Sequence, residues 1–154
     1  MLNPGEVSDA PSPVMTLRVG DLWLAVPVEQ VARIAITTHL WPVPTARADH
    51  LGLMDNNGEI VPVLRLAPEA PTAKPLGAEQ LVAVLQVRGE AIGLAIDGAG
   101  RVYDGFRMSP NPAAPPEALR TTGAKAAHGA DQDFWIIDPD ALWRAAQSDT
   151  LSHS

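Results

Sequence analysis

Apolar and polar residues alternate over many short stretches of the chain, a pattern that is typical of β-strands. Met15, Leu17 and Val19 alternate with more polar neighbours, and Gly20-Asp21 then supplies the two residues of a tight hairpin turn. Further strands are expected at 22–26, 31–37, 60–64, 80–87, 91–96, 102–103 and 134–137. Many short strands separated by turn residues indicate antiparallel barrels rather than a parallel α/β sheet.

Two helical segments are predicted besides the strands. A turn of helix is expected within residues 47–53. A longer helix is expected over 139–147, because Asp138 is a good N-cap and Pro139 suits the first helical position. Its buried side would carry the apolar side chains of Leu142, Trp143 and Ala146.

The ends of the chain differ in composition from its middle. Residues 1–13 are rich in Pro, Gly, Ser and acidic residues, which predicts a disordered N-terminal tail. One domain is expected over 14–147, followed by a flexible polar tail over 148–154. Within the domain, proline-rich loops are expected at 67–77 and 109–118, and residues 119–132 show little pattern and are expected to be mobile.

The stretch from Leu51 to Leu66, LGLMDNNGEIVPVLRL, joins a tight turn to a strongly β-prone run. Pro62 cannot donate a hydrogen bond to a neighbouring strand, so it is expected at a sheet edge or a strand start. This stretch resembles a motif of CheW-like domains: a Gly, an apolar run, Asn-Leu-Arg-Gly, then an apolar run with Pro-Val that ends in Asp-Leu. The matching residues are Gly52, Leu53, Met54, Gly58, Glu59, Ile60, Val61, Pro62, Val63, Leu64 and Leu66.

A second stretch, Ile92-Gly93-Leu94-Ala95-Ile96-Asp97, resembles the family's Val-Gly-Leu-x-Val-Asp, and the resemblance extends over roughly residues 15–146. It implies an all-β fold of two small SH3-like five-stranded β-barrel subdomains packed together, with a short C-terminal helix. A faint internal repeat, in which hairpins at Gly20-Asp21 and Gly89-Glu90 each lead into a similar apolar strand, is compatible with two barrels.

The resemblance also implies a function in bacterial chemosensory signal transduction. Such domains are non-enzymatic adaptors that couple the cytoplasmic tips of chemoreceptors to the regulatory domain of the histidine kinase CheA. Two departures from the family bear on that role. Asn57 stands where the family has an Arg that helps to hold the receptor, and Arg65 stands where the family has an Asp. Receptor contact is therefore expected to be weaker than contact with a CheA-type kinase.

The loop Asp55, Asn56, Asn57, Gly58 and Glu59 is the predicted partner-binding site, with a plain hairpin connection as the alternative. Two other function classes stay open. One is a CheW-like interaction module serving a non-flagellar pathway such as pilus motility. The other is a dimeric aspartic-type hydrolase that uses Asp97, for which the alternative is a carboxylate that caps a turn.

Composition narrows the classes of partner and ligand. The net charge of −7 and the scattered basic residues argue against nucleic acid. With no cysteine and no apolar run long enough to span a membrane, a cytoplasmic protein without disulfides is expected. The four histidines, at 39, 50, 128 and 153, lack metal-ligand spacing, so no metal and no cofactor is predicted.

The context of each large side chain predicts whether it lies in the core or at the surface. The tryptophans at 23, 41, 135 and 143 are predicted to lie in the core or at the subdomain seam, with an exposed anchor as the alternative for Trp41. Leu94 is predicted to be buried in the second barrel. Arg18, Arg33, Arg88 and Arg101 are expected on solvated strand faces or turns.

Overall fold

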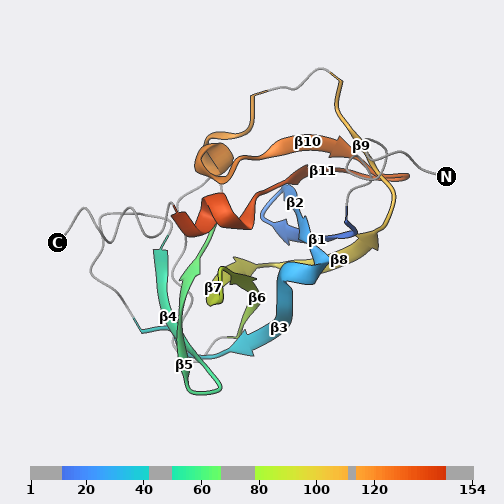
Figure 1. The fold of residues 1–154 in the computed structure, drawn as a ribbon. Helices are drawn as coiled ribbons and strands as arrows, with labels where there is room; N and C mark the ends of the chain where they lie inside the picture. Colours follow the sequence, from blue (N-terminus) through green and yellow to red (C-terminus); the bar gives the residue numbers. More distant parts are fainter. Residues whose placement is uncertain (1–11, 42–49, 67–78, 111–113, 145–154) are drawn as a thin grey trace.

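The computed structural model describes residues 12–41, 50–66, 79–110 and 114–144, and these fold into two β-sheets (Figure 1). The first has the strand order β8-β1-β2-β11-β10-β9 and the second β3-β6-β7-β5-β4. The first sheet contains β1 (Val14–Val19), β2 (Leu22–Pro27), β8 (Gly98–Tyr103), β9 (Arg107–Met108), β10 (Lys125–His128) and β11 (Asp133–Ile136). The second contains β3 (Val31–Thr37), β4 (His50–Asn56), β5 (Glu59–Leu64), β6 (Gln80–Val87) and β7 (Glu90–Ile96).

Neither sheet is a continuous half of the sequence. The N-terminal hairpin β1–β2 shares its sheet with the strands that follow residue 97, and the five-stranded sheet lies between them in the chain. The chain crosses from one sheet to the other through the 3-10 turn η1 (Val28–Gln30) and again at Asp97, between β7 and β8. Each sheet contains one parallel pair, β2 with β11 and β5 with β7, among otherwise antiparallel pairs.

Three apolar clusters show how the strands use their two faces. Alternate residues of a strand point to opposite faces of its sheet. Ile92, Leu94 and Ile96 of β7 belong to a large cluster shared by both sheets, whereas Ala91 and Ala95 belong to a smaller cluster within the five-stranded sheet. A third cluster lies within the six-stranded sheet, where Tyr103 of β8 meets Phe134 of β11 with ring centroids 5.2 Å apart. The predicted fold of two packed barrel subdomains is confirmed, except that one sheet has six strands rather than five.

The hairpin turns use glycine as predicted, but the turn expected at Gly89-Glu90 lies one residue earlier, at Arg88-Gly89, because Val87 pairs with Glu90. Two-residue hairpin turns with positive φ at both positions match the twist of the flanking strands. Asn57 and Gly58 have φ of 55° and 90°, and Arg88 and Gly89 have φ of 55° and 78°. Asn tolerates this conformation far better than most non-glycine residues, and Gly adopts it freely.

Two predictions of local structure are wrong. Residues 50–53 are not helical but begin β4, because they pair with β5 in the hairpin; residues 47–49 lie outside the described part. Residues 119–132 are not a patternless segment. They hold much of the 3-10 helix η2 (Glu117–Thr122) and the whole of β10, whose pairing with β9 and β11 supplies the order that the local sequence does not signal.

Pro62 is also placed differently from the prediction. It lies inside β5, opposite Leu53 of β4, and not at a strand start. Pairing of β5 with its other neighbour, β7, runs from Val63 to Leu64 and so begins one residue after the proline. The interior of this strand therefore tolerates a residue that lacks an N–H.

The C-terminal helix begins as predicted, and its described part covers 139–144. The Asp138 carboxylate accepts a hydrogen bond from the Asp140 amide at 3.0 Å, which is an N-cap contact. Leu142 is fully buried and Trp143 is half-buried against the shared core. The predicted end of the helix near residue 147 lies outside the described residues, as do residues 1–11 and 148–154 of the predicted tails.

Several side-chain placements were predicted correctly and two were not. Leu94 is fully buried, but in the core between the subdomains rather than inside one barrel. The rings of Trp23, Trp135 and Trp143 are half-buried against the cores, whereas Trp41 is 47% exposed, so its assignment to the core is wrong. The predicted solvent exposure of the four arginines is confirmed for Arg18, Arg33, Arg88 and Arg101.

Candidate functional site

The β4–β5 hairpin carries the predicted partner-binding residues at its turn. Figure 1 shows the hairpin as a long two-stranded ribbon whose turn lies at the periphery of the molecule. Asp55 and Asn56 end β4, Asn57 and Gly58 form the turn, and Glu59 begins β5. The structure therefore brings all five predicted residues together at one exposed tip.

The conformation of this turn is fixed by its own side chains. The Asp55 Oδ1 atom accepts a hydrogen bond from the Gly58 amide at 2.7 Å, which closes the turn. Asn57, Gly58 and Glu59 are exposed. The Asn56 Oδ1 atom is buried and has no hydrogen-bond partner among the described residues, so one acceptor at this tip lacks the bond that a buried acceptor needs.

A second hairpin turn, between β6 and β7, lies beside the C-terminal helix. The Arg88 guanidinium pairs with the Asp140 carboxylate, with Nη2 and Oδ2 3.2 Å apart, and it lies 5.6 Å from the centre of the Trp143 ring. The hydrogen bond from Arg88 is the main cause that lowers the pKa of the Asp140 carboxyl. The Trp143 indole N–H donates to the Glu90 carboxylate at 2.9 Å. These contacts hold the helix against the β6–β7 turn and the start of β7.

Between the two hairpin turns lies a hollow of about 290 Å³. Its lining consists of Glu59, Ile60, Pro62, Gly89, Glu90, Ala91, Ile92 and Trp143. Of the five residues predicted to bind a partner, only Glu59 lines this hollow. The sequence predicts that Ile60 lies in a strand but does not indicate that it is exposed, because an apolar residue in an apolar run carries no local signal of exposure.

At the other end of β5, Arg65 forms an ion pair with Asp97, with Nη2 and Oδ2 3.1 Å apart. The same Asp97 oxygen accepts a hydrogen bond from the Gly20 amide, in the turn between β1 and β2, at 2.7 Å. Burial opposes ionisation of this carboxyl, but the hydrogen bonds from Arg65 and Gly20 outweigh it and lower the pKa of Asp97.

The surroundings of Asp97 bear on the hydrolase alternative. An aspartic catalytic pair shares one proton between two carboxylates, which requires that one of them be protonated. Asp97 is instead held in its charged form by a guanidinium and a backbone amide. The predicted turn-capping role is close to what is seen, although the amide belongs to Gly20, which is distant in sequence, rather than to a neighbouring residue.

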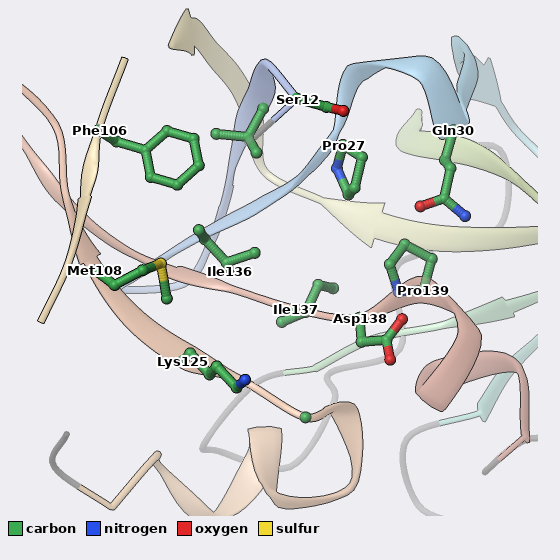
Figure 2. A pocket seen from close by; sticks show the side chains of 12 residues that line it. Ser12, Pro27, Gln30, Phe106, Met108, Lys125, Ile136, Ile137, Asp138 and Pro139 are labelled. Atoms are coloured by element: carbon green, nitrogen blue, oxygen red, sulfur yellow. The ribbon is translucent and has the colours of Figure 1, made fainter. Parts of the chain in front are cut away.

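A larger hollow of about 460 Å³ lies on the six-stranded subdomain (Figure 2). Figure 2 shows Phe106 and Met108 at one end and Gln30 and Pro139 at the other. The walls are mostly apolar, and the charged residues of the lining are Lys125 and Asp138, the second of which is the helix cap. This lining does not specify the chemistry of a ligand.

In the part of the chain that the structure describes, no three His, Cys, Asp or Glu side chains gather in a way that could hold a metal ion. The Nδ1 atom of His128 lies 2.7 Å from the Asp133 carboxylate, which is a pair rather than a metal cluster. None of the described helices has the length and apolar character needed to cross a membrane.

Comparison with known proteins identifies the fold. The sequence model described as "CheW-like domain" matches residues 13–147. No curated protein sequence matches the chain. Among solved structures, the scaffolding protein TtCheW from Thermoanaerobacter tengcongensis is similar, with a TM-score of 0.64 at 14% sequence identity. The alignment covers 83% of this chain and 89% of that one.

Proposed function

Because this chain belongs to the CheW-like domain family, we propose that it is a non-enzymatic adaptor that couples chemoreceptors to a CheA-type histidine kinase in a bacterial chemosensory pathway. The observation that carries the proposal is the family match over 13–147, which spans both subdomains. The fold similarity to a scaffolding protein supports it. The proposed domain is 14–147, and the proposed location is the cytoplasm, where the receptor tips and the kinase lie.

The β4–β5 tip is the proposed contact surface, formed by Asp55, Asn56, Asn57, Gly58 and Glu59. Its support is geometric: the turn is exposed, and its conformation is held by the bond from Gly58 to Asp55. A preorganised surface loop loses little conformational freedom when it binds a partner. The tip therefore suits recognition of a partner surface.

The residues of the tip favour the kinase over the receptor as the stronger partner. The family arginine that helps to hold the receptor is Asn57 here. An arginine offers a planar, charged fork for carboxylates, whereas asparagine is short and neutral. Asp55 and Glu59 add negative charge to the same tip, which disfavours encounter with acidic surfaces.

Binding to two purified partners tests this function. Isothermal calorimetry of the full chain against a CheA-type regulatory domain is expected to show saturable binding, and titration with a receptor cytoplasmic fragment is expected to show weaker binding. A chain that binds neither would contradict the adaptor function. In that case the alternative, a CheW-like interaction module for another pathway such as pilus motility, would be favoured.

The hydrolase alternative has little support. Asp97 is tied to Arg65 and Gly20, which leaves it charged and engaged at the subdomain seam. The proposed role of Asp97 is therefore to join the two subdomains.

A further inference from the structure

One face of the five-stranded sheet continues beyond the core that it shares with the other subdomain. Leu64 of β5 and Ile92 and Leu94 of β7 lie on this face and are fully buried in the shared core. Strand alternation places Pro62 and Ile60 on the same face as Leu64, progressively closer to the β4–β5 turn. Ile60 is 58% exposed, so the face ends in an apolar side chain that the described residues do not cover.

The uncovered end of this face is hollowed rather than flat. Strands β5 and β7 are parallel, and their register of Val63 with Gly93, continued backwards, sets Ile60 beside Glu90. The hollow of about 290 Å³ between the two hairpins contains both of these residues. Trp143 closes it on the side of the helix, where its indole N–H is bound to Glu90.

The charges around the hollow are unequal. Glu59 is exposed and lines it directly, and Glu90 is exposed beside it. The nearby cations Arg88 and Arg144 share the Asp140 carboxylate, and Arg88 also lies over the Trp143 ring, so with Glu59 and Glu90 the described residues of this region have three carboxylates against two cations. The apolar side chains of Ile60 and Pro62, in a hollow whose lining also includes Glu59 and Glu90, suit an apolar side chain that is flanked by a cation.

We propose that this hollow, lined by Ile60, Glu59, Glu90 and Trp143, is a docking site for a protein segment in which an arginine or lysine adjoins an apolar side chain. The apolar side chain packs on Ile60 and Pro62, and the cation pairs with Glu90, while Glu59 at the start of β5 adds negative charge nearby. The inference rests on the proposed adaptor function for the presence of a protein partner, and it adds the partner's chemistry. It predicts a basic contact surface for the partner.

A peptide titration tests the site itself, without any assumption about the natural partner. The probe is the peptide acetyl-Ser-Gly-Arg-Leu-Arg-Gly-Ser-amide, added to the ¹⁵N-labelled full chain and followed by amide chemical shifts. Two control peptides replace both arginines by glutamate or the leucine by serine. The basic, apolar peptide is expected to shift the amides of Ile60, Gly89 and Glu90 and the Trp143 indole signal, and each control peptide is expected to bind at least about fivefold more weakly.

Matched variants of the chain locate the contact. Ile60→Ser is expected to weaken peptide binding about tenfold, the effect of losing a buried isoleucine contact. Glu59→Gln is expected to weaken it about threefold at low salt and to have little effect at about 0.5 M salt, where such pairs are screened. The controls lie on the other subdomain: Val102→Ser removes an apolar side chain that is 52% exposed, and Asp104→Asn removes an exposed carboxylate.

A second arm separates this proposal from the adaptor function. The same variants are titrated with a CheA-type regulatory domain. In the peptide experiment, equal chemical-shift changes with the arginine and glutamate peptides, or no change at the residues that line the hollow, would overturn the docking site. If the peptide does not bind at the hollow and the kinase domain binds the wild type and the Ile60→Ser and Glu59→Gln variants equally, the docking site is wrong while the adaptor function stands. If the peptide binds at the hollow and the kinase domain does not bind at all, the site stands and the proposed kinase partner is wrong.

Discussion

Arg65 and Asp97 form an ion pair at the point where the chain crosses from the five-stranded to the six-stranded sheet, with Nη2 and Oδ2 3.1 Å apart. Arg65 directly follows β5, and Asp97 lies between β7 and β8. The same carboxylate binds the Gly20 amide of the β1–β2 turn. One side chain thus links elements of both subdomains. Arg65 stands where the family has an Asp, and its ion pair with Asp97 gives this departure a structural role.

We expect the pair to stabilise the fold. Its side chains are 15% and 25% exposed, so it is screened less than a fully exposed pair. Arg65→Met and Asp97→Asn should each lower the free energy of unfolding by about 1–3 kcal/mol, because each leaves a charged or polar partner unmatched. Urea melts of both variants and of the double variant give the coupling energy. A coupling near zero would show that the pair does not join the subdomains energetically, and Arg101→Met, which breaks an exposed pair with Asp131, is the control.

Stability should fall in acid. The pKa values of Asp97, Asp131 and Asp140 are lowered in the folded protein. At Asp97, burial raises the pKa, but the hydrogen bonds from Arg65 and Gly20 outweigh it. The hydrogen bond from Tyr103 is the main cause that lowers the pKa of Asp131, and the hydrogen bond from Arg88 is the main cause at Asp140. A lowered folded pKa contributes stability that is fully present above the unfolded pKa of about 3.9 and is lost as the pH falls through the folded value. Urea melts at pH 7 and pH 3 should show the loss, and Asp97→Asn should make it smaller. An unchanged pH dependence in that variant would contradict the assignment to Asp97.

Leu94 and Gly93 test the two faces of β7. Leu94 is fully buried in the shared core, so Leu94→Ala should cost about 2–5 kcal/mol. A Cβ on Gly93 would lie 2.8 Å from a Val82 methyl and 3.1 Å from a Val63 methyl, so Gly93→Ala should overpack the barrel interior and cost about 1–3 kcal/mol. Urea melts measure both. A midpoint shift near zero for either variant would show that the corresponding face is not packed as described.

Asn57→Arg tests partner choice at the β4–β5 tip. It restores the family residue, and it should strengthen binding of a receptor fragment while it leaves binding of a CheA-type regulatory domain nearly unchanged. The gain should be a few tenths of a kcal/mol at an exposed rim and about 2 kcal/mol or more at a buried contact. Calorimetry of both variants against both partners provides the measurement.

The backbone at Asn57 requires a control in that experiment. Its φ of 55° suits Asn better than Arg, so the variant should be slightly less stable, and a thermal melt must show that it remains folded. Tight receptor binding by the wild type, unchanged in Asn57→Arg, would show that receptor contact is made elsewhere on the barrels.

The sequence by itself determined the features that depend on near neighbours. The tight turn over 55–58, the helix start at Asp138-Pro139 and most strands were predicted, because turn residues, caps and alternation act within a few positions. The two motifs also indicated the family, which the match over 13–147 confirms. The apolar run over 92–96 also predicted that Leu94 is buried.

Only the tertiary structure decided what depends on distant pairs. Residues 50–53 became strand because they pair with β5, and β10 formed because β9 and β11 flank it. Alternation shows that a strand has two faces, but not which face meets the other subdomain, so Leu94 was assigned to the wrong core. Arg65, Asp97 and Gly20 meet, and Ile60 remains exposed beside Glu90, through packing between segments that lie far apart in the chain.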